Sequence, residues 1–113
     1  CAPIVRAFEA GETAVEPWLA TPSTIAAGLR VPAPSEGDLV LDRVRASGGR
    51  MLAVSEPAIR EAVRDLAATE GVFACPEGAA TVPAAARLAA AGDLEGPVVL
   101  YNTGSGIKYV DVL

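Results

Sequence analysis

The residues best suited to chemistry lie near the end of the chain, in the run Thr103-Gly104-Ser105-Gly106. A hydroxyl group beside glycines, with bare backbone N–H groups and no bulky side chains, can bind a phosphate or the ring nitrogen of a ligand. The same residues would also form an ordinary tight turn, and their spacing alone does not separate the two interpretations. The run is not a P-loop, because no Gly-Lys-Ser/Thr follows at the required spacing.

A second candidate is Glu77, in the run Cys75-Pro76-Glu77-Gly78. A carboxylate in the first turn of a helix stabilises that helix through its dipole, which is the structural interpretation. The functional interpretation places Glu77 at the mouth of the same cleft as the glycine-rich turn. Two parallel strands would precede these two sites, and parallel strands end on the same edge of a sheet.

Other reactive residues give weaker indications. The chain has no His and two Cys, which excludes a Ser-His-Asp triad, a Cys-His pair and a four-Cys metal site within it. We therefore expect no metal site. Cys75 is interpreted as a small core residue, and Lys108 as a solvated cation, because nothing near it indicates the desolvated pocket that a Schiff-base lysine needs.

Charge and hydropathy narrow the classes of partner. The formal net charge of the 113 residues is −5, which argues against nucleic-acid binding because phosphate recognition needs a surplus of Lys and Arg. No apolar run reaches the roughly 18 residues of a membrane span, and no charged-then-apolar leader opens the chain. We expect a cytoplasmic protein without a membrane partner.

The elements that position these residues alternate between helix and strand. Apolar spacing and capping residues predict helices over 2–10, 38–47, 57–70 and 79–91. Short apolar runs predict buried strands over 51–54, 72–75 and 97–102. A proline-rich, irregular loop is expected over 12–36, with a brief helix inside it that ends near Leu29.

This alternation predicts an α/β fold, part of a doubly wound and mostly parallel sheet flanked by helices. Three short strands need neighbours at their edges. We therefore expect residues 1–113 to be a single segment of a larger domain, and the natural chain to extend upstream of Cys1.

Three segments in order resemble the C-terminal part of the threonine synthase family, within the fold-type II pyridoxal-phosphate enzymes. They are Ser23 to Pro32 (STIAAGLRVP), Ser47 to Ala80 (through SGG, LAVS and EGVFACPEGAA) and Asn102 to Tyr109 (NTGSGIKY). Each segment alone is a weak signal. Together they cover nearly all of the chain in the expected order.

The resemblance implies a lyase of amino-acid biosynthesis that converts O-phosphohomoserine and water into threonine and phosphate, with pyridoxal 5'-phosphate as cofactor. It places the Thr103 hydroxyl at the pyridine nitrogen, with Gly104 and Ser105 beside it, and Glu77 in the cleft. The family's Schiff-base lysine and phosphate loop lie upstream, and Lys108 does not match the catalytic position. The resemblance thus implies no catalytic residue in this chain, an incomplete large domain, and the remainder of the enzyme and an amino-acid phosphate as partners.

One alternative remains open on the sequence. The chain could be a free-standing, non-catalytic α/β module that binds a small anion at the glycine-rich turn. Such a module would pair its open sheet edge with a partner or with a second copy in a homodimer, because an unpaired edge strand is prone to such pairing.

Overall fold

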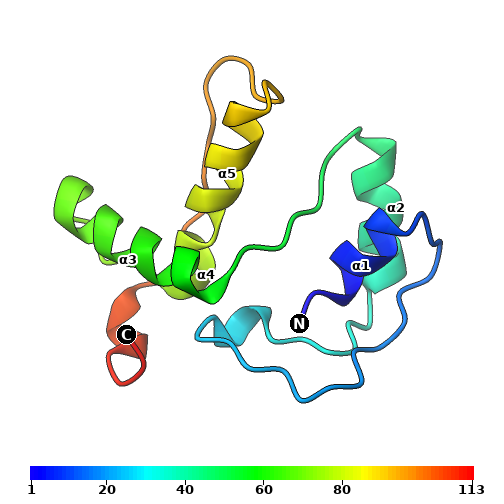
Figure 1. The fold of residues 1–113 in the computed structure, drawn as a ribbon, viewed down its shortest axis with the longest axis horizontal. Helices are drawn as coiled ribbons and strands as arrows, with labels where there is room; N and C mark the ends of the chain where they lie inside the picture. The colour runs from blue at the N-terminus through cyan, green and yellow to red at the C-terminus, as the bar shows by residue number, and fades with distance from the viewer. The chain divides into compact units, whose positions relative to one another are not determined.

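The computed structural model describes residues 1–113 and consists of helices and loops, without a β-strand (Figure 1). The elements in chain order are α1 (Pro3–Glu9), η1 (Ala27–Leu29), α2 (Gly37–Ala46), α3 (Glu56–Glu70), α4 (Pro76–Ala79), α5 (Thr81–Ala90) and η2 (Gly106–Tyr109), where η marks a 3-10 helix. The chain divides into two compact units, one formed by Cys1–Thr24 with Leu29–Ala53 and the other by Ile25–Gly28 with Val54–Leu113.

In the first unit α1 packs against α2 and buries Ala7 and Leu41. The guanidinium of Arg45, on α2, donates hydrogen bonds to the carbonyl oxygens of Ala7 and Phe8 at the end of α1, and to that of Glu12 in the next loop. A cation near the carbonyl end of a helix also interacts favourably with its dipole. Arg45 therefore binds the carbonyl end of α1 and the loop that follows it to α2.

The second unit is built on α3, which begins and ends as its sequence predicts. The Ser55 hydroxyl accepts a hydrogen bond from Ala58 N–H and caps the first turn. Gly71 ends the helix in the left-handed conformation, with φ of 67°, which glycine adopts without a steric cost. The inner face of α3 joins two buried clusters, one of Ile25, Ala26, Ile59 and Ala80 and the other of Ala62, Val63, Ala74 and Ala79.

The helix expected over 79–91 is instead two helices, α4 and α5, separated at Ala80. The first begins earlier than predicted, because Pro76 occupies its first position and the Cys75 side chain caps it. The break has a physical reason in Pro83. Proline has no N–H to donate to the carbonyl of Ala79, so one bond of a continuous helix is missing there.

The expected sheet is not confirmed. None of the segments 51–54, 72–75 and 97–102 forms a strand, and all three are drawn as plain tube in Figure 1. A single isolated antiparallel bridge joins Ala74 to Ser105. The physical reason is that a strand is stable only when a neighbour satisfies its backbone groups, and these three segments do not pair with one another.

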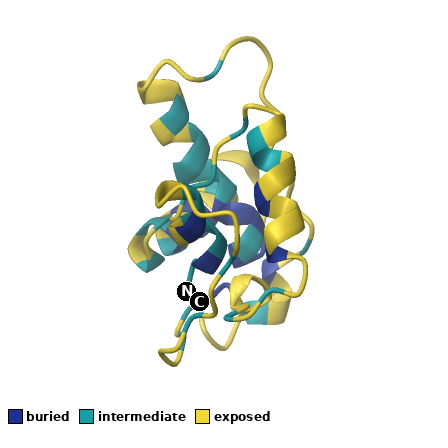
Figure 2. Ribbon diagram, turned by 90° about the vertical axis from the view of Figure 1, so that its right-hand side faces the viewer, coloured by how far each residue is buried: buried dark blue, intermediate teal, exposed yellow.

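The segments predicted as buried strands are also more exposed than expected. In Figure 2 much of the ribbon is coloured as exposed, and the buried residues occupy small parts of it. The fractional exposure is 76% for Val99 and 79% for Tyr101, where burial on both faces was predicted. No helix in the structure combines the length and the apolar character needed to cross a membrane.

Candidate functional site

The site is centred on the carboxylate of Glu77, in the first turn of α4. Its Oε1 atom accepts a hydrogen bond of 2.7 Å from the backbone N–H of Gly28 and another of 2.7 Å from the hydroxyl of Tyr109. Its Oε2 atom is buried and has no hydrogen-bond partner. We call Glu77, Gly28 and Tyr109 the Glu77 clasp. It ties together the three segments that carry the family resemblance.

The two ends of the Tyr109–Glu77 hydrogen bond change each other's acidity. Burial of Glu77 raises its pKa and is the largest single effect, but hydrogen bonds, first from Tyr109 and then from Gly28 N–H, outweigh it, so that the pKa lies below its ordinary 4.5. The pKa of Tyr109 is raised above its ordinary 10.0, first by the hydrogen bond to Glu77 and then by burial. Both shifts favour an ionised carboxylate that accepts a bond from a neutral phenol.

This pair is expected to stabilise the protein over a defined pH range. The lowered pKa of Glu77 makes its contribution complete above pH 4.5 and lost as the pH falls through the folded-state pKa. The raised pKa of Tyr109 makes its contribution complete below pH 10.0 and lost as the pH rises through the folded-state pKa. Urea titrations should show a difference in unfolding free energy between wild type and Glu77→Gln that is constant between these values and shrinks outside them. A difference that drifts steadily across the range would contradict this expectation.

Cys75 joins the start of α4 to the glycine-rich turn. Its backbone N–H donates to the carbonyl of Gly104 at 3.0 Å, and its sulfur accepts from Gly78 N–H at 3.4 Å. Its thiol lies 3.5 Å from Oδ1 of Asn102. The residue is 4% exposed. These contacts fit the predicted core role, and they leave the sulfur poorly placed to act as a nucleophile.

Gly78 allows the turn to approach α4 closely. A Cβ atom at this position would overlap the side chain of Asn102 and lie 2.9 Å from its Cα. The absence of a side chain at Gly78 is thus used, in this structure, for close approach by the chain itself.

Backbone hydrogen bonds hold the turn at 103–106 on either side of the Ala74–Ser105 bridge, one at Gly104 and one at Gly106. Gly106 N–H donates to the carbonyl of Phe73 at 2.8 Å. The Ser105 hydroxyl accepts from Ile107 N–H at 3.3 Å and so caps η2. Thr103 and Ser105 are both exposed, so both hydroxyl-bearing residues of the turn lie at the surface.

The structure brings the predicted site residues into one unit but adds two partners that the sequence did not indicate. These partners are Tyr109 and Gly28. The phenol of a tyrosine usually finds a hydrogen-bond partner when it is buried, and this is the one signal that could have indicated Tyr109. Nothing in the sequence marks Gly28, because only its backbone N–H takes part.

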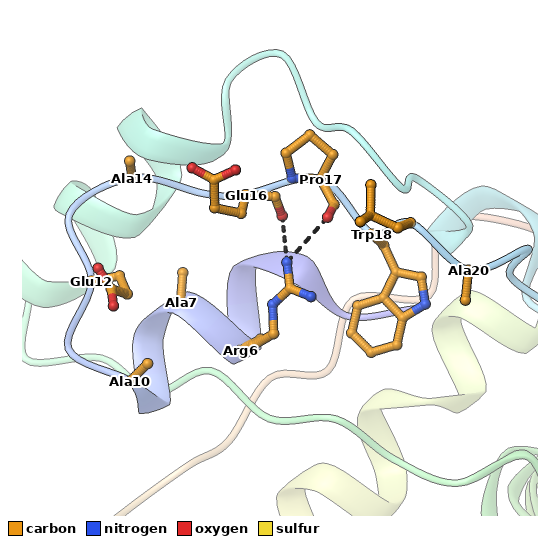
Figure 3. Close-up of a pocket in the computed structure, with 10 residues that line it drawn as sticks. Arg6, Ala7, Ala10, Glu12, Ala14, Glu16, Pro17, Trp18 and Ala20 are labelled. Carbon is orange, nitrogen blue, oxygen red and sulfur yellow. Dashed lines mark hydrogen bonds between the residues drawn. The ribbon is translucent and has the colours of Figure 1, made fainter.

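The first unit contains a separate cavity of about 650 Å³ between α1 and the loop that follows it (Figure 3). The guanidinium of Arg6 donates hydrogen bonds there to the carbonyl oxygens of Glu16 and Pro17 and lies 5.1 Å from the ring centre of Trp18. Arg6 is thus engaged in holding the loop onto α1. None of the predicted site residues lines this cavity.

A family model and several individual proteins that match this chain point to the same enzyme family. A family model described as "Pyridoxal-phosphate dependent enzyme" matches residues 1–104. The chain is 34% identical over 111 residues to the threonine synthase of Methanocaldococcus jannaschii, an overlap of 96% of this chain and 27% of that protein. It is 33% identical over 108 residues to that of Methanosarcina acetivorans (94% and 26%). It is also 36% identical over 90 residues to that of Synechocystis (80% and 24%). The chain spans about a quarter of the length of these curated relatives.

Proposed function

Because the chain belongs to the family of pyridoxal-phosphate dependent enzymes, we propose that it is the C-terminal part of a threonine-synthase-like lyase. The complete enzyme would convert O-phosphohomoserine and water into threonine and phosphate. The 113 residues alone would not catalyse this reaction, because the lysine that anchors the cofactor and the loop that binds its phosphate would lie in the rest of the enzyme. The matches to proteins named threonine synthase over most of this chain support this proposal.

The observation that carries the proposal is the Glu77 clasp. One carboxylate accepts hydrogen bonds from Gly28, in the first of the three resembling segments, and from Tyr109, in the last. Glu77 itself lies in the second. Segments that merely shared composition with the family would have no reason to meet at one atom.

The exposed part of the turn would bind the pyridoxal ring. Thr103 offers a neutral hydroxyl that would hydrogen-bond the ring nitrogen, with Gly104 and Ser105 beside it. The exposure of Thr103 and Ser105 supports this placement. The cofactor, when bound, would supply an electron sink for carbanionic chemistry. A neutral partner for the nitrogen would keep that sink weaker than a full pyridinium and favour elimination.

The remainder of the enzyme would complete the sheet. The apolar segment 97–102 has exposed side chains and pairs with no strand in this structure. Strands from the rest of a fold-type II domain, or from a second copy in a homodimer, would satisfy its backbone and cover its apolar residues. The acidic balance of the chain argues against a nucleic-acid partner.

Cofactor retention tests the proposal. The full-length protein, incubated with pyridoxal phosphate and dialysed, should keep the cofactor's absorbance band and release phosphate from O-phosphohomoserine. The 113-residue chain treated in the same way should do neither. A band that survives dialysis of the short chain would contradict the proposed division of the site. A full-length protein that binds the cofactor but leaves O-phosphohomoserine unchanged would contradict the substrate.

A further inference from the structure

The Glu77 carboxylate connects parts of the chain that are far apart in sequence. Gly28 lies 49 residues before it and Tyr109 lies 32 residues after it. The approach of Gly28 is as close as packing allows, because a Cβ there would lie 3.0 Å from Oε1 of Glu77. Backbone on one side and a phenol on the other thus enclose the same oxygen atom.

Neither oxygen of this carboxylate is free at the surface of the protein. Oε1 already accepts two hydrogen bonds, and Oε2 is buried. A carboxylate that binds a substrate or cofactor would present an oxygen to the surface of a cleft. Glu77 instead forms an internal tie, by which we mean that its carboxylate links two other segments of the chain through hydrogen bonds.

Tyr109 carries the effect of that tie to the glycine-rich turn. It is the last residue of η2, and η2 begins at Gly106, the last residue of the turn. The first end of η2 is fixed by the hydrogen bond from Gly106 N–H to the Phe73 carbonyl. The other end is fixed by the Tyr109 hydroxyl on Glu77. A four-residue helix held at both ends leaves the turn little freedom to shift.

The chain after Tyr109 has anchors of its own. The backbone N–H groups of Val112 and Leu113 both donate to the Tyr109 carbonyl at 3.0 Å. The Leu113 side chain packs against both buried clusters of the unit, and Arg60 donates to the Val112 carbonyl at 2.7 Å. Release of the Tyr109 hydroxyl should therefore affect η2 and the turn before it more than the last residues of the chain.

We propose that Glu77 is a positioning residue, which acts through Tyr109 to hold the turn at 103–106 and does not itself touch cofactor or substrate. Only the catalytic consequence of this role rests on the proposed function. The tie itself is a property of the folded protein and can be measured without cofactor or substrate.

The first test uses the full-length protein without cofactor. Glu77→Gln weakens the acceptor, Tyr109→Phe removes one donor, and Glu61→Gln is the matched control on an exposed position of α3. We expect amide hydrogen exchange over 103–109 to become faster in the first two variants, and over 25–28 in Glu77→Gln alone. The Tyr109 phenol, identified by its absence from Tyr109→Phe, should titrate at a lower pH in Glu77→Gln than in wild type. The control should match wild type in each measurement.

The second test is a double-mutant cycle on kcat/KM for O-phosphohomoserine. If Glu77 acts through Tyr109, each single variant should lose roughly tenfold, as expected for one hydrogen bond to a charged group. The double variant should then lose no more than the worse single variant. A residue in contact with the cofactor or substrate would lose far more in Glu77→Gln than in Tyr109→Phe, and the two losses would multiply.

The positioning role of Glu77 and the proposed enzymatic function can fail independently in these tests. Unchanged exchange over 103–109 in Glu77→Gln, or losses that multiply, would overturn the positioning role. If Glu77→Gln does not fold, hydrogen exchange in Tyr109→Phe decides. Faster exchange confined to 103–109 would support the positioning role, and unchanged exchange there would contradict it. If the full-length protein has no activity on O-phosphohomoserine, the proposed function fails, while exchange and tyrosine titration still decide the role of Glu77.

Discussion

Replacement of Gly106 by alanine is expected to lower the free energy of unfolding by about 1–3 kcal/mol, the cost typical of an overpacked position. The added Cβ would lie 2.6 Å from the ring of Phe73 and 2.8 Å from the carbonyl oxygen of Ala74. The ring is 42% exposed and can rotate away, but the carbonyl is backbone next to the Ala74–Ser105 bridge. Relief of the overlap therefore requires the turn to separate from the backbone at Ala74. A urea titration of the purified protein measures the loss.

Gly104→Ala is the matched control for this substitution, because it adds the same methyl group to the same turn. Its Cβ would lie 3.4 Å from the Cys75 sulfur, an ordinary van der Waals distance. Neither glycine has a positive φ, so backbone strain does not distinguish them. We expect Gly104→Ala to unfold at nearly the wild-type urea concentration. Equal stability of the two variants would show that the close packing at Gly106 is not a constraint on the turn.

The helices could be predicted because their signals are local. Ser55 and Gly71 mark the ends of α3 in the sequence, and the structure confirms both. The apolar spacing of this segment also indicates a buried face, correctly at Ile59 and Val63 and wrongly at Ala67, which is exposed. The strands could not be predicted in the same way, since a strand depends on a neighbour that its own sequence does not name. The segment 97–102 has strand composition and forms no strand in this structure.

In the candidate site, too, the local features could be predicted from the sequence and the tertiary contacts could not. The type and place of Glu77 and Thr103 follow from short motifs, so the sequence indicates them as candidates. The partners of Glu77 follow from tertiary packing and could not be predicted from spacing. As a result the sequence suggested a carboxylate in a cleft, and the structure gives it two internal hydrogen bonds. The largest effect on catalysis is therefore expected at Thr103.

Thr103→Ala in the full-length enzyme is expected to reduce kcat/KM more than tenfold, equivalent to roughly 1.4 kcal/mol in the activation barrier. The substitution removes the exposed hydroxyl proposed to meet the ring nitrogen, and the Ser105 hydroxyl is expected to stay in place as the cap of η2, where it accepts Ile107 N–H. Steady-state kinetics with O-phosphohomoserine and the spectrum of the bound cofactor measure the effect. Thr103→Ser keeps the hydroxyl and should retain most of the activity, which separates loss of the hydrogen bond from loss of the methyl group. An unchanged rate in Thr103→Ala would remove Thr103 from the site and place the ring nitrogen against another part of the enzyme.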